Sequence, residues 1–153
     1  MDAEVWPDER VVRFVNESFL PARVHVKDPD NAFKRISERF QAPWTPTILL
    51  LDPSGAEQHR IEGFLPTEDF LPQLMLGRAR IAFHEQQWAD AERRYRQIVE
   101  QFPNTDAAAE ALYWAGVAPY KATGNPQSLK ATGEAFTKRY QTTSWAKKAS
   151  VWR

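Results

Sequence analysis

The feature that most constrains the fold of this chain is a short apolar run between two proline-containing turns. The run extends from Ile48 to Leu51, after Trp44-Thr45-Pro46-Thr47 and before Asp52-Pro53-Ser54-Gly55. A run of this length predicts a strand buried on both faces, because a buried helix needs more residues. The residues after the run favour a type I turn, in which Asp bonds nearby backbone, Pro presets φ and Gly closes the turn.

A second strand is predicted directly after this turn, at residues 57–64. Polar residues alternate there with His59, Ile61 and Gly63, which is the period of a strand with one buried face. The two strands therefore form a hairpin. Pro66-Thr67-Glu68 then opens a helix, as expected for proline and acidic residues in a first helical turn.

Three further elements are predicted before the hairpin. Residues 8–17 have helical spacing and an acidic first turn, and residues 19–26 alternate as a strand does. A second helix is expected to be capped by Asp30 and to run to Phe40, with Phe33 and Ile36 on its apolar face.

These residues resemble the second half of the thioredoxin fold. The resemblance is carried by the Thr-Pro-Thr entry at 45–47, the turn at 52–55, the Arg-Ile-Glu-Gly-Phe segment at 60–64 and the helix that follows. It implies that the peptide bond before Pro46 is cis and that Pro46 faces a redox-active Cys-x-x-Cys. It also implies that the loop before Pro46 binds extended peptides through its backbone.

The same resemblance implies that an earlier part of the fold is missing. Residues 1–19 are similar to the segment that follows the Cys-x-x-Cys in this family, and the absent part would include the first parallel strand, between the strands at 20–26 and 47–52. Those two strands would then expose unpaired backbone groups. The natural protein could begin upstream of Met1, the sheet could close differently, or a second chain could complete the sheet. We favour the first.

Composition excludes several functions for the chain as given. It contains no cysteine, so it has no thiolate nucleophile, disulfide or cysteine metal site. His25, His59 and His84 stand on different elements without ligand-like spacing, and the serines and glycines form no catalytic or phosphate-binding motif. We therefore expect no metal, no cofactor and no catalytic residue.

Charge and hydropathy argue against nucleic acid and membrane as partners, and the resemblance implies a protein or peptide partner instead. The chain carries 20 basic and 20 acidic side chains, a formal charge of zero that argues against nucleic acid. No apolar run is long enough for membrane insertion, and no signal peptide is visible. The compartment stays open, with the cytoplasm expected if Met1 is the true start.

After residue 66 the pattern is helical, and it repeats. Helices are predicted at 67–86, 88–102, 106–122, 127–140 and 144–152. The stretch from Phe102 to Trp114 aligns with that from Tyr140 to Trp152, an offset of 38 residues. This offset, with small residues at helix crossings, resembles the tetratricopeptide repeat of about 34 residues. The fold class is thus an incomplete α/β thioredoxin-like domain at 1–74 and an all-α tetratricopeptide-like (TPR-like) array at 75–153, of two repeats and a closing helix, docked on the helix at 67–76.

Two places are candidates for binding. The first is Trp44, Thr45 and Pro46, where Trp44 either contacts a bound peptide or packs against Phe40 and the sheet edge. The second is a groove of the helical array that Tyr113 and Tyr120 could line, although most aromatic residues at helical spacing there, Tyr95 among them, are expected in the core.

The sequence leaves two functions of different class open. The natural protein is either a thiol–disulfide oxidoreductase with its Cys-x-x-Cys upstream of Met1, or a redox-inactive scaffold. The scaffold would bind peptides through the Pro46 loop and the helical groove.

Overall fold

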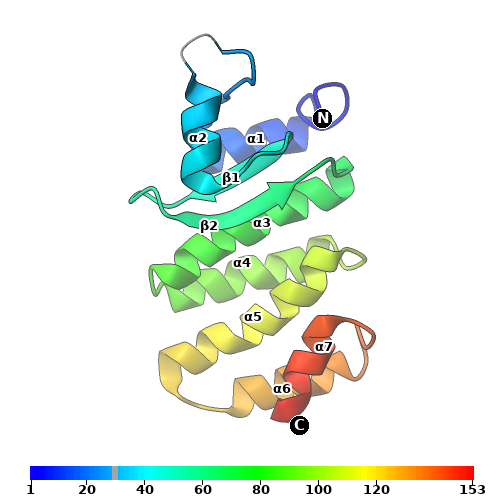
Figure 1. Cartoon of the computed structure of the whole chain (residues 1–153). Coiled ribbons are helices and arrows are strands. Elements are labelled where there is room, and N and C mark those ends of the chain that lie inside the picture. Colours follow the sequence, from blue (N-terminus) through cyan, green and yellow to red (C-terminus); the bar gives the residue numbers. More distant parts are fainter. Residues whose placement is uncertain (29–30) are drawn as a thin grey trace. The chain divides into compact units, whose positions relative to one another are not determined.

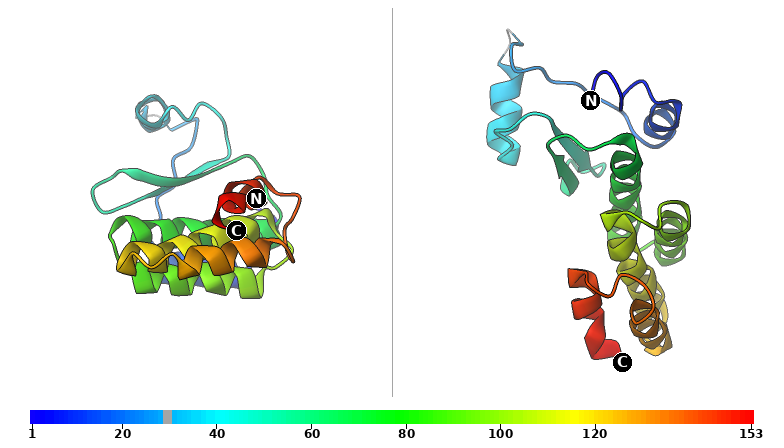
Figure 2. Two further views of the ribbon diagram at one scale, coloured as in Figure 1. Left: turned by 90° about the horizontal axis from the view of Figure 1, so that it is seen from below. Right: turned by 90° about the vertical axis from the view of Figure 1, so that its right-hand side faces the viewer.

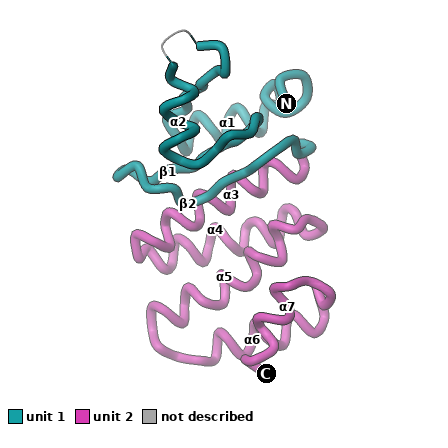
Figure 3. The backbone as a smooth tube through the Cα atoms, in the orientation of Figure 1, with its two compact units in different colours: residues 1–67 teal, residues 68–153 magenta. Residues whose placement is uncertain are grey.

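The computed structural model describes residues 1–28 and 31–153 (Figure 1). They form two compact units, Met1–Thr67 and Glu68–Arg153 (Figure 3). The first unit contains two helices, α1 (Glu9–Ser18) and α2 (Ala32–Phe40), and a hairpin of β1 (Thr47–Leu51) and β2 (Glu57–Glu62). The second unit is helical. The division predicted after residue 74 falls inside its first helix, α3 (Thr67–His84).

The hairpin is antiparallel, and its register places the two buried side chains of β2 opposite apolar side chains of β1. Ile48 pairs with Ile61 and Leu50 with His59, and the register shifts between Leu50 and Leu51. Leu50, His59 and Ile61 are buried. The alternation in β2 thus gives the half-buried strand predicted from its sequence.

The hairpin turn depends on one carboxylate. Asp52 Oδ1 accepts hydrogen bonds from Ser54 N, Ser54 Oγ and Ala56 N at 2.9, 2.5 and 3.0 Å, and Oδ2 accepts one from Gln58 Nε2 at 2.7 Å. The Gly55 N–H also donates to the Asp52 carbonyl, and Gly55 has a φ of 82°, which favours glycine. Asp52 therefore performs the role that the sequence assigned to it.

The first helix begins with a side-chain cap at Asp8, and the second begins without one. The Asp8 side chain accepts a hydrogen bond from Arg10 N, and α1 begins at Glu9. The cap predicted at Asp30 lies outside the described residues. α2 begins after Asn31, which has left-handed backbone geometry and forms no side-chain cap bond.

The prediction of a strand at residues 19–26 is wrong. This segment has no strand structure, and Leu20, Val24 and Val26 are exposed by 100%, 37% and 49%. Within the described residues β1 pairs with β2 alone, so the sheet has two strands. A strand needs a neighbour for its backbone groups, and the alternating pattern at 19–26 finds none.

Consecutive helices of the second unit lie side by side in a row (Figures 1 and 2). They are α3, α4 (Trp88–Gln101), α5 (Asp106–Thr123), α6 (Gln127–Phe136) and α7 (Ser144–Ala149), followed by the 3₁₀ turn η1 (Ser150–Trp152). α6 ends earlier than the predicted residue 140. Its last turn tightens, because the N–H groups of Thr137 and Lys138 bond to carbonyls three residues back.

The fifth helix packs closely because its buried face is built from small residues. Ala108, Ala111 and Ala118 are fully buried, and Gly116 faces Thr132 of α6. A Cβ atom at Gly116 would lie 2.0 Å from Thr132 Oγ1, so only glycine permits this approach of α6. Tyr95 of α4 is 1% exposed, and burial raises the pKa of its hydroxyl.

The 38-residue offset in the sequence corresponds to two equivalent turns. The Thr105 hydroxyl donates to the Phe102 carbonyl at 2.9 Å, and 38 residues later the Thr143 hydroxyl donates to the Tyr140 carbonyl at 2.7 Å. The two threonines occupy the N-cap positions of α5 and α7. The Tyr140 hydroxyl also donates to the Pro103 carbonyl at 2.8 Å and so joins the two turns.

The Asp52 turn should make stability depend on pH. Hydrogen bonds from Ser54 and Ala56 lower the pKa of Asp52 from 3.8 to about 2. The folded state therefore favours the carboxylate, so this contribution is complete above the unfolded value and is lost as the pH falls toward 2. Denaturant titrations should find Asp52→Asn less stable than the parent near neutral pH, with the difference shrinking between about pH 4 and 2. A difference that is constant across this range would contradict this role.

The packing of α5 on α6 predicts the effect of one added methyl group. Gly116→Ala should lower the free energy of unfolding by about 1–3 kcal/mol, because the new Cβ overlaps Thr132. Ala122→Ser, at an exposed site on the same helix, should change it by less than about 0.5 kcal/mol. Thermal unfolding followed by circular dichroism measures both, and equal effects would show that the helix crossing is not tight.

Candidate functional site

The candidate site is the loop of residues 43–46, between α2 and β1. The Thr45–Pro46 peptide bond in this loop is cis, the isomer that the resemblance implies. Trp44 is 72% exposed, and Thr45 and Pro46 are also exposed. Most of the Trp44 side chain therefore faces solvent rather than packing against Phe40 or the sheet.

Two hydrogen bonds hold the loop on the hairpin. The Thr47 hydroxyl donates to the Trp44 carbonyl at 2.7 Å, and the Gly63 N–H donates to the Pro46 carbonyl at 2.8 Å. The first fixes the turn before β1, and the second ties it to the end of β2. The exposed residues are thus presented from a backbone fixed at both sides.

Arg60 of β2 fixes the other end of the loop. Its Nη1 donates to the Gln41 carbonyl at 3.1 Å, its Nη2 donates to the Phe40 carbonyl, and it pairs with Glu57 and Glu62. The guanidinium lowers the pKa of Glu57 through a hydrogen bond and by its charge. Because the last carbonyls of a helix lack helical partners, a cation there stabilises the end of α2.

The loop leaves backbone groups open to a ligand. Within the described part of the chain, the Thr45 N–H and carbonyl form no hydrogen bond. An extended polypeptide that lies along this loop could therefore pair with Thr45 as a neighbouring strand would, with Trp44 as an apolar contact.

The two tyrosines of the second candidate site differ in their surroundings. Tyr113 is half-buried, and its ring stacks on Trp152 with centroids 4.5 Å apart and lies 5.2 Å from Trp145. Burial raises the pKa of its hydroxyl. Tyr120 is 37% exposed, and it lies on the same face of α5, since seven residues make about two helical turns.

A cluster of half-buried aromatic side chains surrounds Tyr113. The sequence predicted only part of it. Ring contacts connect α3, α4, α5, α7 and η1 through Phe83, Trp88, Tyr113, Trp114, Trp145 and Trp152. The signal in the sequence for this cluster was the alignment of Trp114 with Trp152 at the 38-residue offset. Trp145 aligns with an alanine and could not be found in this way.

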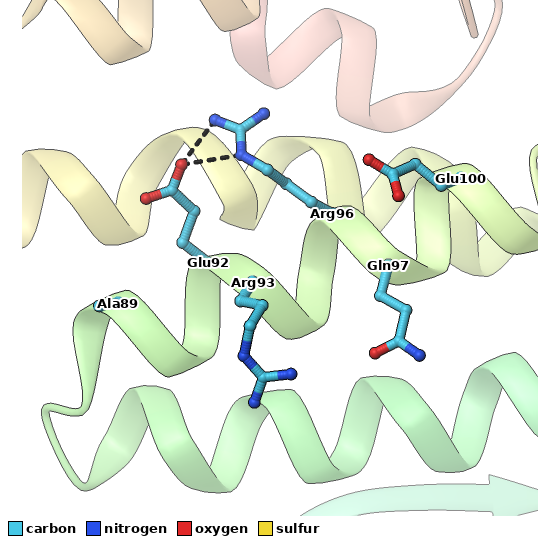
Figure 4. A pocket seen from close by; sticks show the side chains of 6 residues that line it. All are labelled: Ala89, Glu92, Arg93, Arg96, Gln97 and Glu100. Carbon is cyan, nitrogen blue, oxygen red and sulfur yellow. Dashed lines mark hydrogen bonds and ion pairs between the residues drawn. The ribbon is translucent and has the colours of Figure 1, made fainter.

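Other polar groupings do not form a site. A surface hollow on α4 is lined by Glu92, Arg93, Arg96 and three neighbours of the same helix (Figure 4), and Glu92 pairs with Arg96. Because no second element contributes to it, the hollow lacks convergent groups. The described residues contain no cluster of three or more His, Asp or Glu side chains suited to a metal ion. No described helix is long and apolar enough to cross a bilayer.

Comparison with known proteins identifies the first part of the chain. Residues 1–76 match the family model described as a thioredoxin-like domain, so this part is thioredoxin-like. No curated protein and no solved structure gives a significant match to the chain. The match contains α1, α2, the hairpin and the Trp44–Pro46 loop.

The exposure of Trp44 predicts a residue that is dispensable for folding. Trp44→Ala should change the free energy of unfolding by less than about 0.5 kcal/mol, because little of the ring is buried. Leu50→Ala in the adjacent strand should cost about 2–5 kcal/mol, since Leu50 is 4% exposed. Denaturant unfolding compares the two, and a Trp44 cost near that of Leu50 would show that the ring is packed.

Proposed function

We propose that the natural protein is a thioredoxin-family thiol–disulfide oxidoreductase. In this proposal the Trp44–Pro46 loop holds a polypeptide substrate, and a Cys-x-x-Cys motif precedes Met1. The observation that carries the proposal is the loop itself, which is exposed, fixed by hydrogen bonds at both sides and open at the Thr45 backbone. The match of residues 1–76 to a thioredoxin-like domain supports it.

The open sheet is a second support. β1 has a neighbour on one side only among the described residues, and the segment at 19–26 keeps a strand pattern without strand structure. A parallel strand inserted between them would pair with the backbone groups of both. The same insertion could come from a second chain, which is the alternative source of the strand.

The proposed chemistry is thiol–disulfide exchange. One thiolate of the motif attacks a sulfur of a substrate disulfide and displaces the other sulfur as a thiolate, which gives a mixed disulfide. The second cysteine then displaces the substrate, so the motif is oxidised to a disulfide and the substrate is reduced to two thiols. Residues 1–153 contain no cysteine, so in this chain they could only bind and orient the substrate.

The second candidate is a peptide-binding scaffold without redox chemistry. It is favoured by the half-buried aromatic rings around Tyr113. The equivalent turns at Thr105 and Thr143 support a TPR-like array, in which Tyr113 and Tyr120 would line the binding groove. A protein or peptide is the partner in both candidates.

The two candidates predict different proteins in the native source. For the oxidoreductase, the intact mass should exceed 17.6 kDa, and a thiol-reactive probe should label two cysteines after reduction. Mass spectrometry of the protein purified from its native source measures both. A mass of 17.6 kDa without thiols would refute the oxidoreductase and leave the scaffold.

A further inference from the structure

The basic and acidic side chains of this neutral chain are unevenly distributed along it. Residues 120–153 contain seven Lys or Arg and a single acid, Glu134, for a net charge of +6. Residues 1–119 contain thirteen basic and nineteen acidic side chains, for a net charge of −6. The C-terminal 34 residues are therefore strongly basic, although the formal charge of the chain is zero.

The structure leaves this charge without internal carboxylate partners. Among the described residues, at least eight of the thirteen earlier cations form ion pairs: Arg10, Arg23, Lys34, Arg60, Arg80, Arg93, Arg94 and Arg96. Among the described residues, none of the seven later cations has such a partner: Lys121, Lys130, Lys138, Arg139, Lys147, Lys148 and Arg153. All seven are exposed, so their charge is available to a ligand.

The cations lie on elements that pack together. α6 contacts both α7 and η1, and the Arg153 side chain approaches Gly133 of α6. Lys130 is on α6, Lys138 follows it, and Lys147 is on α7. Residues 120–153, which we call the basic segment, thus combine cations from neighbouring helices on one folded support.

We propose that the basic segment binds an acidic segment of another polypeptide. The cations without carboxylate partners indicate a negatively charged ligand, because a positively charged or neutral partner gains no electrostatic attraction from them. The inference rests on the binding role of the helical unit in the scaffold candidate, and it names the chemistry of the ligand.

The aromatic rings favour a polypeptide over a single-stranded nucleic acid. Single strands are held by exposed ring faces on which bases stack. Here Trp152 stacks on Tyr113, and Lys148 Nζ lies 3.8 Å from the centroid of the Trp145 ring. One face of each of these rings is therefore covered within the protein.

The experiment measures binding of labelled peptides to the whole chain by fluorescence anisotropy. Octaglutamate should bind, and its affinity should fall as salt rises from about 0.05 to 0.3 M, because the contacts are exposed ion pairs. Lys138→Glu with Lys147→Glu should weaken this binding about tenfold or more. Neither lysine contacts an aromatic ring, so the fold should be preserved. The matched control, Lys27→Glu with Lys34→Glu, makes the same charge change in the first unit and should leave binding unchanged.

Each other outcome overturns the inference in a distinguishable way. No binding of octaglutamate, or equal weakening by the control pair, would show that the basic segment is not its site. Equal affinity for octaglutamine would remove the requirement for acidic residues while leaving the scaffold candidate standing. Tighter binding to an eight-nucleotide oligothymidylate, or to vesicles containing phosphatidylserine, would assign the basic segment to a nucleic acid or to an anionic membrane.

Discussion

The helical unit depends on the close approach that the small residues of α5 permit. α5 contacts α4, α6 and α7, and the buried alanines on it add almost no volume to these crossings. The approach of Thr132 limits the size of the residue at position 116, since nothing larger than glycine fits there without movement of α6. Interiors are packed at nearly crystalline density, so displacement of α6 would also disturb α7 and the rings that it supports.

The thioredoxin-like unit is organised differently, around polar contacts that place one loop. Arg60 joins β2 to the end of α2, and Asp52 closes the hairpin. Both side chains bond to backbone groups as well as to other side chains, and the carbonyls that Arg60 bonds lie about 20 residues from it along the chain. The unit therefore fixes the backbone on both sides of Pro46 while it leaves Trp44 and Thr45 in solvent. This is the geometry expected where a protein presents a loop to a ligand.

Local signals in the sequence predicted most of the helices and strands. The predictions that fail concern structure that depends on residues far apart along the chain. The Asp52 turn and the Asp8 cap depend on neighbours a few residues away, so their chemistry can be found in the sequence. The segment at 19–26 has a strand pattern, but strand structure needs a partner that local sequence cannot supply. The loop at Trp44 was found through a family resemblance, whereas its support by Arg60 comes from contacts about 20 residues apart along the chain.

The hydrogen bond from Tyr140 to Pro103 has a consequence for how such a chain can lengthen. It joins two turns that are equivalent by sequence and by the bonds of Thr105 and Thr143. A duplication of residues 106–143 would end in another turn of the same kind and would bring its own tyrosine to bond the turn before it. Growth by gene duplication would therefore repeat this hydrogen bond at each added turn, so each new copy would be joined to the preceding one at its turn.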